Sequence, residues 1–220
     1  MEALVSHLIR LETYRAIKKE NRPLRILIAE DDTRMAHLMV MSLKSLGHNV
    51  IGAADNGADL VELTRRLQPD LLIVDVVMPR MDGFDALAQI SAESSFPAII
   101  SSGQCTDDFL KRAQELGIEA YLSKPFSKEQ LTSSIAMAIS VHTSLLEAKM
   151  QIVALTGEIE LMKAVESAVT LLMERFRIDR KEALEKLETA ARARSSTLLE
   201  AAKAISTTLR PAVQLDNAAV

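Results

Sequence analysis

The chain of 220 residues is poor in several residue types on which particular protein classes depend. It has one cysteine, Cys105, which excludes an intrachain disulfide framework and fits a reducing compartment. No apolar run approaches the roughly 18 residues that a membrane-spanning helix needs. Residues 1–4 have neither the basic start nor the long apolar core of a signal peptide. These absences predict a cytoplasmic protein without a membrane partner.

Aromatic residues are also scarce. They make up 3 % of the chain, which disfavours any mechanism in which nucleobases stack on several aromatic rings. The net charge is −4, but residues 174–210 contain nine Lys and Arg against six Asp and Glu. An acidic body with a mildly basic C-terminal part permits a polyanionic partner at that end without requiring one.

Short apolar segments alternate with amphipathic segments from residue 25 onward. An amphipathic helix expected at residues 3–19, within an N-terminal segment of residues 1–22, ends before Pro23. Strands are then expected at 25–29, 49–54, 70–75, 97–101 and 119–122, with helices at 33–46, 57–67, 84–93 and 107–116 and another after Ser127. This alternation predicts an α/β fold: a five-stranded, parallel, doubly wound, flavodoxin-like domain over residues 24–140.

Only helices are expected beyond residue 127. Apolar residues there repeat at spacings of 4 and 3, first at Ala148, Ile152, Leu155, Ile159 and Met162, and then, after a shift of phase, at Val165, Val169, Leu172 and Phe176. This heptad pattern predicts one helix of about 40 residues, with a coiled-coil linker at 141–160. A long isolated helix gains little stability in water, so we expect a homodimer through residues 145–176. The alternative is that this pattern packs against the C-terminal helices of the same chain.

Two shorter helices are expected at residues 180–193 and 197–208. Asp179 is the predicted N-cap of the first, and Ser195 or Ser196 that of the second. With the end of the long helix they predict a small three-helix unit over residues 161–210. Residues 211–220 are expected to form a disordered tail.

Polar residues follow four of the expected strands at their carboxyl ends. Glu30, Asp31 and Asp32 follow the first strand, Asp75 ends the third, residues 101–103 (Ser-Ser-Gly) end the fourth, and Lys124 with Pro125 follows the fifth. Each has an ordinary interpretation as a cap or turn residue, and capping is the expected role of Asp32. Together they meet at one crevice of a parallel sheet. Carboxylates crowded in this way suit a hard divalent cation such as Mg²⁺.

This set of residues suits phosphoryl transfer to a carboxylate. That reaction needs positioning and charge neutralisation more than acid or base catalysis. Asp75 would be the nucleophile and would form an acyl phosphate. Mg²⁺ and Lys124 would bind the phosphoryl oxygens, and Ser102 would donate a hydrogen bond to one of them.

With these motifs, residues 24–140 resemble the receiver domain of bacterial two-component response regulators. The resemblance implies a sensor histidine kinase as partner and Asp75 as the phosphoacceptor. It implies Mg²⁺ as cofactor, bound by Glu30, Asp31, Asp75 and the backbone carbonyl of Val77. It also implies that Lys124 binds the phosphoryl group, that Ser102 and Tyr121 act as switch residues, and that a cis bond precedes Pro125. A phosphatase of the haloacid dehalogenase type is disfavoured, because its nucleophile follows the first strand.

The C-terminal helices resemble an ANTAR domain, the RNA-binding module of transcription antiterminators. The resemblance lies in residues 168–175, 182–187 and 197–202. The chain departs from the family pattern at Val169-Thr170, where Lys-Gly is usual, at Leu184, where an aromatic is usual, and at Glu188, where a basic residue is common. The resemblance implies a regulator rather than an enzyme, and an RNA stem-loop as ligand, with Arg180, Lys181, Arg192, Arg194 and Lys203 as candidate contacts. The alternative is that these helices mediate dimerisation or bind a protein without RNA.

Overall fold

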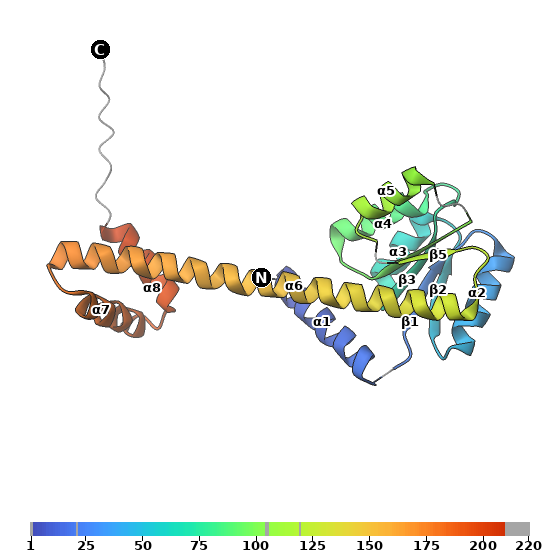
Figure 1. Cartoon of the computed structure of the whole chain (residues 1–220). Helices are drawn as coiled ribbons and strands as arrows, with labels where there is room; N and C mark the ends of the chain where they lie inside the picture. Colours follow the sequence, from blue (N-terminus) through green and yellow to red (C-terminus); the bar gives the residue numbers. More distant parts are fainter. Residues whose placement is uncertain (1, 21, 104–105, 119, 210–220) are drawn as a thin grey trace, which may run out of the picture. The chain divides into compact units, whose positions relative to one another are not determined.

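The computed structural model describes the chain except residues 1, 21, 104–105, 119 and 210–220, and except the side chains of residues 2–7, 18–20 and 107–108 (Figure 1). The expected tail and Cys105 therefore lie outside the described residues. The chain forms two compact units, residues 1–150 (the N-terminal unit) and 151–220 (the C-terminal unit). None of the described helices has the length and apolarity that crossing a bilayer requires.

The N-terminal unit is built on one parallel sheet in the strand order β2-β1-β3-β4-β5, which confirms the predicted fold (Figure 1). Its strands are β1 (Arg25–Ala29), β2 (Asn49–Ala54), β3 (Leu71–Asp75), β4 (Ala98–Ser102) and β5 (Ala120–Ser123). Every residue of β3 and β4 is buried, because helices cover both faces of the sheet. The register places Asp75 beside Ser101 and Ser102 beside Ser123.

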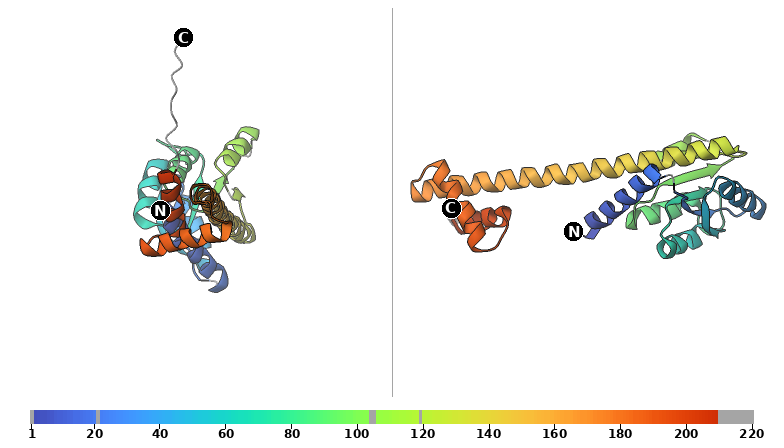
Figure 2. Two further views of the ribbon diagram at one scale, coloured as in Figure 1. Left: turned by 90° about the vertical axis from the view of Figure 1, so that its left-hand side faces the viewer. Right: turned by 90° about the horizontal axis from the view of Figure 1, so that it is seen from below.

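Two helical layers enclose this sheet (Figures 1 and 2). One core contains residues of α1 (Glu2–Glu20), α2 (Thr33–Ser45) and the first part of α6 (Lys128–Phe176), together with Ile26, Ile28, Leu71, Ile73 and Ile99 of the sheet. The other contains residues of α3 (Gly57–Leu67), α4 (Gly83–Glu93) and α5 (Asp107–Glu115), together with Leu27, Leu72, Val74 and Ile100. Alternate strand residues therefore enter opposite cores.

The N-terminal helix α1 lies beside α6 (Figures 1 and 2) and contacts the chain just before the first residue of β3. Tyr14 is 2 % exposed, and its hydroxyl donates to the backbone carbonyl of Asp70 at 3.2 Å. The Tyr14 ring meets His142 of α6 edge-on, with 5.2 Å between the ring centroids. Arg15 pairs with Glu147 of α6 at 3.0 Å. The N-terminal helix thus connects α6 to the sheet.

The C-terminal unit consists of the end of α6, α7 (Arg180–Ala193) and α8 (Leu198–Leu209). Its core is made largely of small residues, which allow close approach of the helices: Ala168, Val169, Leu172, Ala183, Leu187, Ala191, Ala201 and Ala202. Asp179 caps α7 as predicted, accepting from the Glu182 N–H at 2.8 Å. The predicted cap of α8 was wrong: Thr197 and Glu200 form a reciprocal capping box instead of Ser195 or Ser196.

The long helix is longer than expected, because the last receiver helix and the coiled-coil segment are one helix of 49 residues. The shifted part of the heptad pattern packs within the C-terminal unit, where Val169 is fully buried and Leu172 is 5 % exposed. Residues 151–160 are all exposed. The alternative of packing within the same chain therefore holds for the shifted part of the pattern, whereas the homodimer through residues 145–176 stays a prediction.

Replacing Tyr14 by Ala should lower the free energy of unfolding by roughly 3 kcal/mol, because it removes a buried ring and its hydroxyl contact. Leu8→Ala is the matched control, since Leu8 is on the same helix and 47 % exposed. Chemical denaturation followed by circular dichroism measures both variants. Equal losses in the two would mean that α1 does not dock through Tyr14.

Gly83 should also be intolerant of a side chain. A Cβ at this position would lie 2.1 Å from the backbone oxygen of Asp75, whereas a Cβ at Gly103 would meet nothing within 4 Å. We expect Gly83→Ala to cost about 2 kcal/mol or more and Gly103→Ala to be close to neutral, because only the first forces the backbone apart. Thermal unfolding of both variants checks the difference, and a harmless Gly83→Ala would contradict this close approach.

Candidate phosphoacceptor site and nucleic-acid interface

The carboxyl ends of β1, β3 and β5 bring the predicted site residues together. The Lys124 ammonium lies between two carboxylates, 2.5 Å from Glu30 Oε2 and 2.7 Å from Asp75 Oδ2. Asp31 joins them: Glu30, Asp31 and Asp75 each offer an oxygen, and these atoms lie within 4.8 Å of one another. Glu30 and Lys124, which are far apart in the sequence, thus meet at one point because the strands that they follow are parallel and belong to one sheet.

The burial of these groups makes their charges interact strongly. Glu30 is 4 % exposed and Asp75 is 8 % exposed, whereas Asp31 faces solvent. Three carboxylates and one ammonium leave a formal charge of −2, which a divalent cation would balance. All the candidate ligand atoms are hard oxygens, and so the donor set fits Mg²⁺.

The protonation of the site follows from the same burial. Burial raises the pKa of Glu30, and the hydrogen bond from Lys124 opposes that shift while the charge of Asp75 adds to it. Burial also disfavours the Lys124 ammonium, but its hydrogen bonds to Asp75 and Glu30 prevail and raise the pKa of Lys124. Lys124 therefore remains a fixed positive charge at neutral pH.

The loop after β3 orients Asp75 from the other side. The Val77 N–H donates to Asp75 Oδ1 at 3.3 Å, and the Gly83 N–H donates to the Val76 carbonyl at 2.9 Å. The absence of a side chain on Gly83 allows α4 to begin directly against this strand end. Val77 itself is 74 % exposed, and the role of its carbonyl as a metal ligand stays a prediction. Asp32, by contrast, caps α2 as expected, accepting from the Arg34 and Met35 N–H groups.

The predicted switch residues are directly connected. The Tyr121 hydroxyl donates to the Ser102 carbonyl at 3.2 Å, and the Lys124 N–H donates to the same carbonyl at 2.9 Å. The Lys124–Pro125 peptide is cis, as the resemblance implied. Lys124 and Tyr121 thus share one backbone acceptor on Ser102.

Sequence reasoning missed a row of aromatic rings that begins at Tyr121. Tyr121 packs edge-on against Phe109, with 5.2 Å between centroids, and Phe109 packs edge-on against Phe84 at 5.3 Å. The row connects β5, α5 and α4. The signal was available, since three of only seven aromatic residues in the chain lie in it. Arg112 of α5 covers the end of the row, 4.6 Å above the Phe84 ring, and pairs with Asp82 at 3.2 Å.

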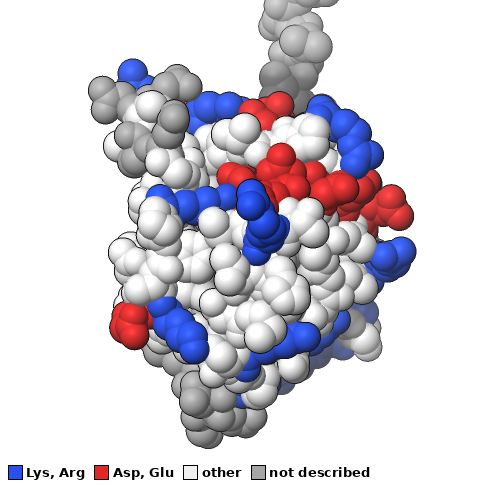
Figure 3. Space-filling model, turned by 90° about the vertical axis from the view of Figure 1, so that its right-hand side faces the viewer, with Lys and Arg blue, Asp and Glu red and all other residues white. Residues whose placement is uncertain are grey.

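An acidic groove beside the site was also missed. It has a volume of about 550 Å³, and its lining includes Glu30, Asp31, Asp55, Asp59 and Glu62. Arg80 partly neutralises it through ion pairs with Asp55 and Asp59 at 3.0 and 3.3 Å. Figure 3 shows acidic side chains gathered on one part of the surface, with basic side chains around them. A positively charged partner surface would be attracted there.

The candidate RNA contacts fall into two groups. Arg180, Arg192 and Lys203 pair with Glu166, Glu188 and Glu160 at 2.7, 3.1 and 2.6 Å, all on exposed surfaces. Within the part of the chain that the structure describes, Lys181 and Arg194 form no ion pair, and both are exposed. Exposed pairs of this kind contribute little to stability, and so a phosphate could displace the carboxylates. Lys181 and Arg194 would need no such exchange.

Comparisons with known proteins agree with both parts of the chain. A response regulator receiver domain is matched at residues 26–136 and an ANTAR domain at residues 154–205. Transcriptional regulatory protein PdtaR of Mycobacterium tuberculosis (strain ATCC 25618 / H37Rv) is 33 % identical over 187 residues, which are 85 % of this chain and 91 % of PdtaR.

Solved structures match the N-terminal unit. The signal receiver domain of a modulated diguanylate cyclase from Desulfovibrio desulfuricans G20 is 31 % identical with a TM-score of 0.52, covering 55 % of this chain and 96 % of that one. The signal receiver domain of NarL from Mycobacterium tuberculosis is 25 % identical with a TM-score of 0.51, covering 54 % and 98 %. The chain therefore belongs to the response regulators that join a receiver domain to a C-terminal ANTAR domain, a family of regulatory rather than catalytic proteins.

Proposed function

We propose that the chain is a phosphorylation-controlled transcription antiterminator. Asp75 accepts a phosphoryl group from a sensor histidine kinase, and the C-terminal unit of a homodimer binds RNA stem-loops. The observation that carries the first part is the Lys124 ammonium between Asp75 and Glu30, beside Asp31. Family membership supports RNA binding and antitermination as the output.

The contacts of Asp75 suit it to act as the nucleophile. Lys124 holds Oδ2 and the Val77 N–H holds Oδ1, and so the carboxylate is oriented from two sides. In the transfer, a carboxylate oxygen of Asp75 bonds to phosphorus while the bond from phosphorus to the kinase histidine nitrogen breaks. Glu30, Asp31, Asp75 and the Val77 carbonyl would hold Mg²⁺, which supplies positive charge to the phosphoryl oxygens when it is bound. Lys124 supplies a second positive charge there.

Phosphorylation then shifts an equilibrium between two conformations. The Ser102 hydroxyl donates to a phosphoryl oxygen, which draws the end of β4 toward Asp75. Because Tyr121 and Lys124 both bond to the Ser102 carbonyl, this movement changes the contacts of the aromatic row and the surface formed by residues 107–126. The phosphoryl group acts through contacts that it makes in only one of the two conformations.

Asp75→Asn should abolish labelling by acetyl phosphate and Mg²⁺, since an amide cannot form the acyl phosphate. Asp32→Asn is the matched control, because it makes the same chemical change at a helix cap, where Asn also caps well. Intact-protein mass spectrometry measures the phosphorylated fraction. Undiminished labelling of the Asp75→Asn protein, or loss of labelling only in the control, would place the phosphoacceptor elsewhere.

RNA binding should depend on the basic residues that lack a carboxylate partner. Replacing Lys181 and Arg194 together by Ala should weaken binding of a leader-RNA hairpin and reduce the slope of log Kd against log salt by roughly 1.5 to 2, as expected for two lost phosphate contacts. Lys44→Ala with Arg66→Ala removes the same charge from exposed positions of the receiver and should have little effect. Fluorescence anisotropy over a salt series measures both.

A second candidate function is a receiver whose helical end binds a protein without RNA. Two observations favour it. Arg180, Arg192 and Lys203 already form ion pairs with carboxylates of this chain. In addition, the apolar Val169 is buried at the position where the family usually has Lys. Failure of the phosphorylated protein to bind any leader hairpin at low salt would support this alternative.

A further inference from the structure

A basic pocket lies in the N-terminal unit, between α1 and the amino ends of the strands. It has a volume of about 450 Å³, which is within the usual range of small-molecule sites. Its lining includes Arg25 of β1, Asp70 before β3 and Phe96 before β4, whereas the acidic site lies at the carboxyl ends of the strands. Arg10 of α1 and Arg22, between α1 and β1, complete its charged lining. Three arginines and one aspartate give this lining a formal charge of +2, although the whole chain has a net charge of −4.

The guanidinium of Arg10 is held in one position by neutral partners. It lies over the Phe96 ring, with 3.9 Å between Cζ and the ring centroid. It donates to the Ser95 carbonyl at 2.6 Å and to Gln68 Oε1 at 3.0 Å. Burial lowers the pKa of Arg10, because the charge loses water and no carboxylate among the described residues pairs with it. An anion in the pocket would compensate this charge.

The other two arginines are held in different ways. Arg22 forms a two-point ion pair with Asp70, at 3.1 and 3.2 Å, and this pair uses the one carboxylate that lines the pocket. Arg25 donates to two backbone carbonyls at the end of α3, each at 2.8 Å, and it has no ion pair with a described carboxylate. The pocket therefore contains two guanidinium charges, those of Arg10 and Arg25, whose contacts are to neutral oxygens.

Neutralising the carbonyl end of α3 is the ordinary explanation for such charges. It accounts for Arg25 only in part, because α3 already has Arg65 and Arg66 in its last turn. It does not account for Arg10, whose acceptors are a side-chain amide oxygen and the carbonyl of Ser95, outside α3. Each guanidinium has five N–H donors, and the bonds described above use two on Arg10 and two on Arg25. Donors therefore remain for the oxygens of a ligand.

We propose that the basic pocket binds the phosphate or diphosphate group of a small molecule. Guanidinium groups bind phosphate oxygens through charge-assisted, often paired, hydrogen bonds. Arg10 and Arg25 come from different elements and both bond to Gln68, so their charges converge on one space. Ile9 and Phe96 give the same pocket an apolar wall for the organic part of the ligand. The volume suits a small molecule rather than a macromolecule.

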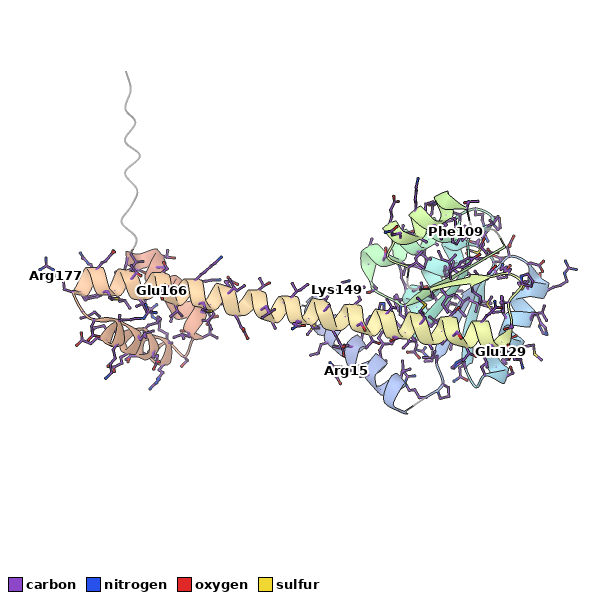
Figure 4. The ribbon with its side chains drawn as sticks, in the orientation of Figure 1. Arg15, Phe109, Glu129, Lys149, Glu166 and Arg177 are labelled. Atoms are coloured by element: carbon purple, nitrogen blue, oxygen red, sulfur yellow. The ribbon has the colours of Figure 1, made fainter. Side chains whose placement is uncertain are left out.

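Occupation of the pocket stabilises the docking of α1. Arg10 and Tyr14 line the pocket from α1, whereas Arg25 lines it from the sheet. The Tyr14 ring also contacts α6, and Figure 4 shows Arg15 of α1 beside α6, with which it pairs through Glu147 at 3.0 Å. A ligand that contacts both α1 and the sheet binds the docked arrangement and shifts the equilibrium toward it. A phosphorylated small molecule would thus control the attachment of α6 independently of the phosphoacceptor.

Isothermal titration calorimetry of the full chain with inorganic pyrophosphate tests the site. EDTA is present and Mg²⁺ is omitted, so that the acidic site does not bind a metal complex of pyrophosphate. We expect one saturable site per chain, with a dissociation constant that Ile9→Glu raises at least about tenfold, because it adds a carboxylate to the lining of the pocket. Ile9 is 62 % exposed, and so this change removes no core contact.

Leu8→Glu is the matched control. It adds the same charge at the neighbouring position, which is 47 % exposed and does not line the pocket. It should leave the dissociation constant within about twofold at physiological salt, where charges outside direct contact are screened. A chain that does not bind pyrophosphate at millimolar concentration overturns the proposal. Equal affinities of the wild type and Ile9→Glu, or equal weakening by Ile9→Glu and Leu8→Glu, overturn it as well.

Two further measurements test the role of Arg10 and the link to α1. Arg10→Gln should weaken pyrophosphate binding about tenfold, whereas Arg65→Gln removes an equal charge from the exposed side of α3 and should not. Saturating pyrophosphate should slow amide hydrogen exchange in residues 8–17 of the wild type but not of Ile9→Glu. Unaltered binding by Arg10→Gln contradicts the assignment of that residue, and unaltered exchange in the saturated wild type overturns the link to the docking of α1.

Discussion

The site depends on one electrostatic constraint: buried carboxylates crowded at the end of a parallel sheet need compensating positive charge. Glu30 and Asp75 are almost fully buried, and the Lys124 ammonium lies within hydrogen-bonding distance of both. This contact joins the first, third and last strands at the edge where the loops emerge. The charge that remains is negative, and so the site would attract a divalent cation.

The same contact links the chemistry to the rest of the receiver. The backbone of Lys124 and the hydroxyl of Tyr121 share the carbonyl of Ser102, and the Tyr121 ring is the first of three aromatic rings that reach α4. A displacement of Ser102 would change both hydrogen bonds at once, and the packed rings offer little free volume around Tyr121. The acidic site and the aromatic row are therefore connected through the carbonyl of Ser102.

The helix α6 serves different purposes along its 49 residues. Its first part completes the receiver core and is fastened by α1 through Tyr14. Its last part supplies one third of the small C-terminal bundle through Ala168, Val169 and Leu172. Between them it carries an apolar stripe that includes Ile152, Leu155 and Ile159, which no described part of the chain covers. One helix can do this because a 3.6-residue period offers separate faces to separate partners.

Much of the fold could be predicted from the sequence, because strands that are buried on both faces are continuously apolar and helices carry a 3.6-residue period. The observed strands differ from the predicted ones by at most one residue at each end. The grouping of Glu30, Asp75 and Lys124 at one edge followed from parallel topology alone. The row of aromatic rings and the acidic groove could not be predicted in this way. They bring together residues of different elements, and contacts between elements produce no regular spacing in the sequence.

The sequence by itself determined the order of elements, the candidate acids and lysine, and a heptad pattern in the long helix. Only the tertiary structure decided which part of that pattern is already covered. Val169 and Ile152 have the same chemistry and similar spacing, yet one is fully buried and the other is 63 % exposed. The tertiary structure also decided which basic residues form ion pairs, as Arg180 does with Glu166. The spacing of apolar residues specifies that one face of a helix is apolar, and the positions of Lys and Arg specify that a surface is charged. Which residues cover that face, and which carboxylates pair with those charges, is fixed only when the helices pack.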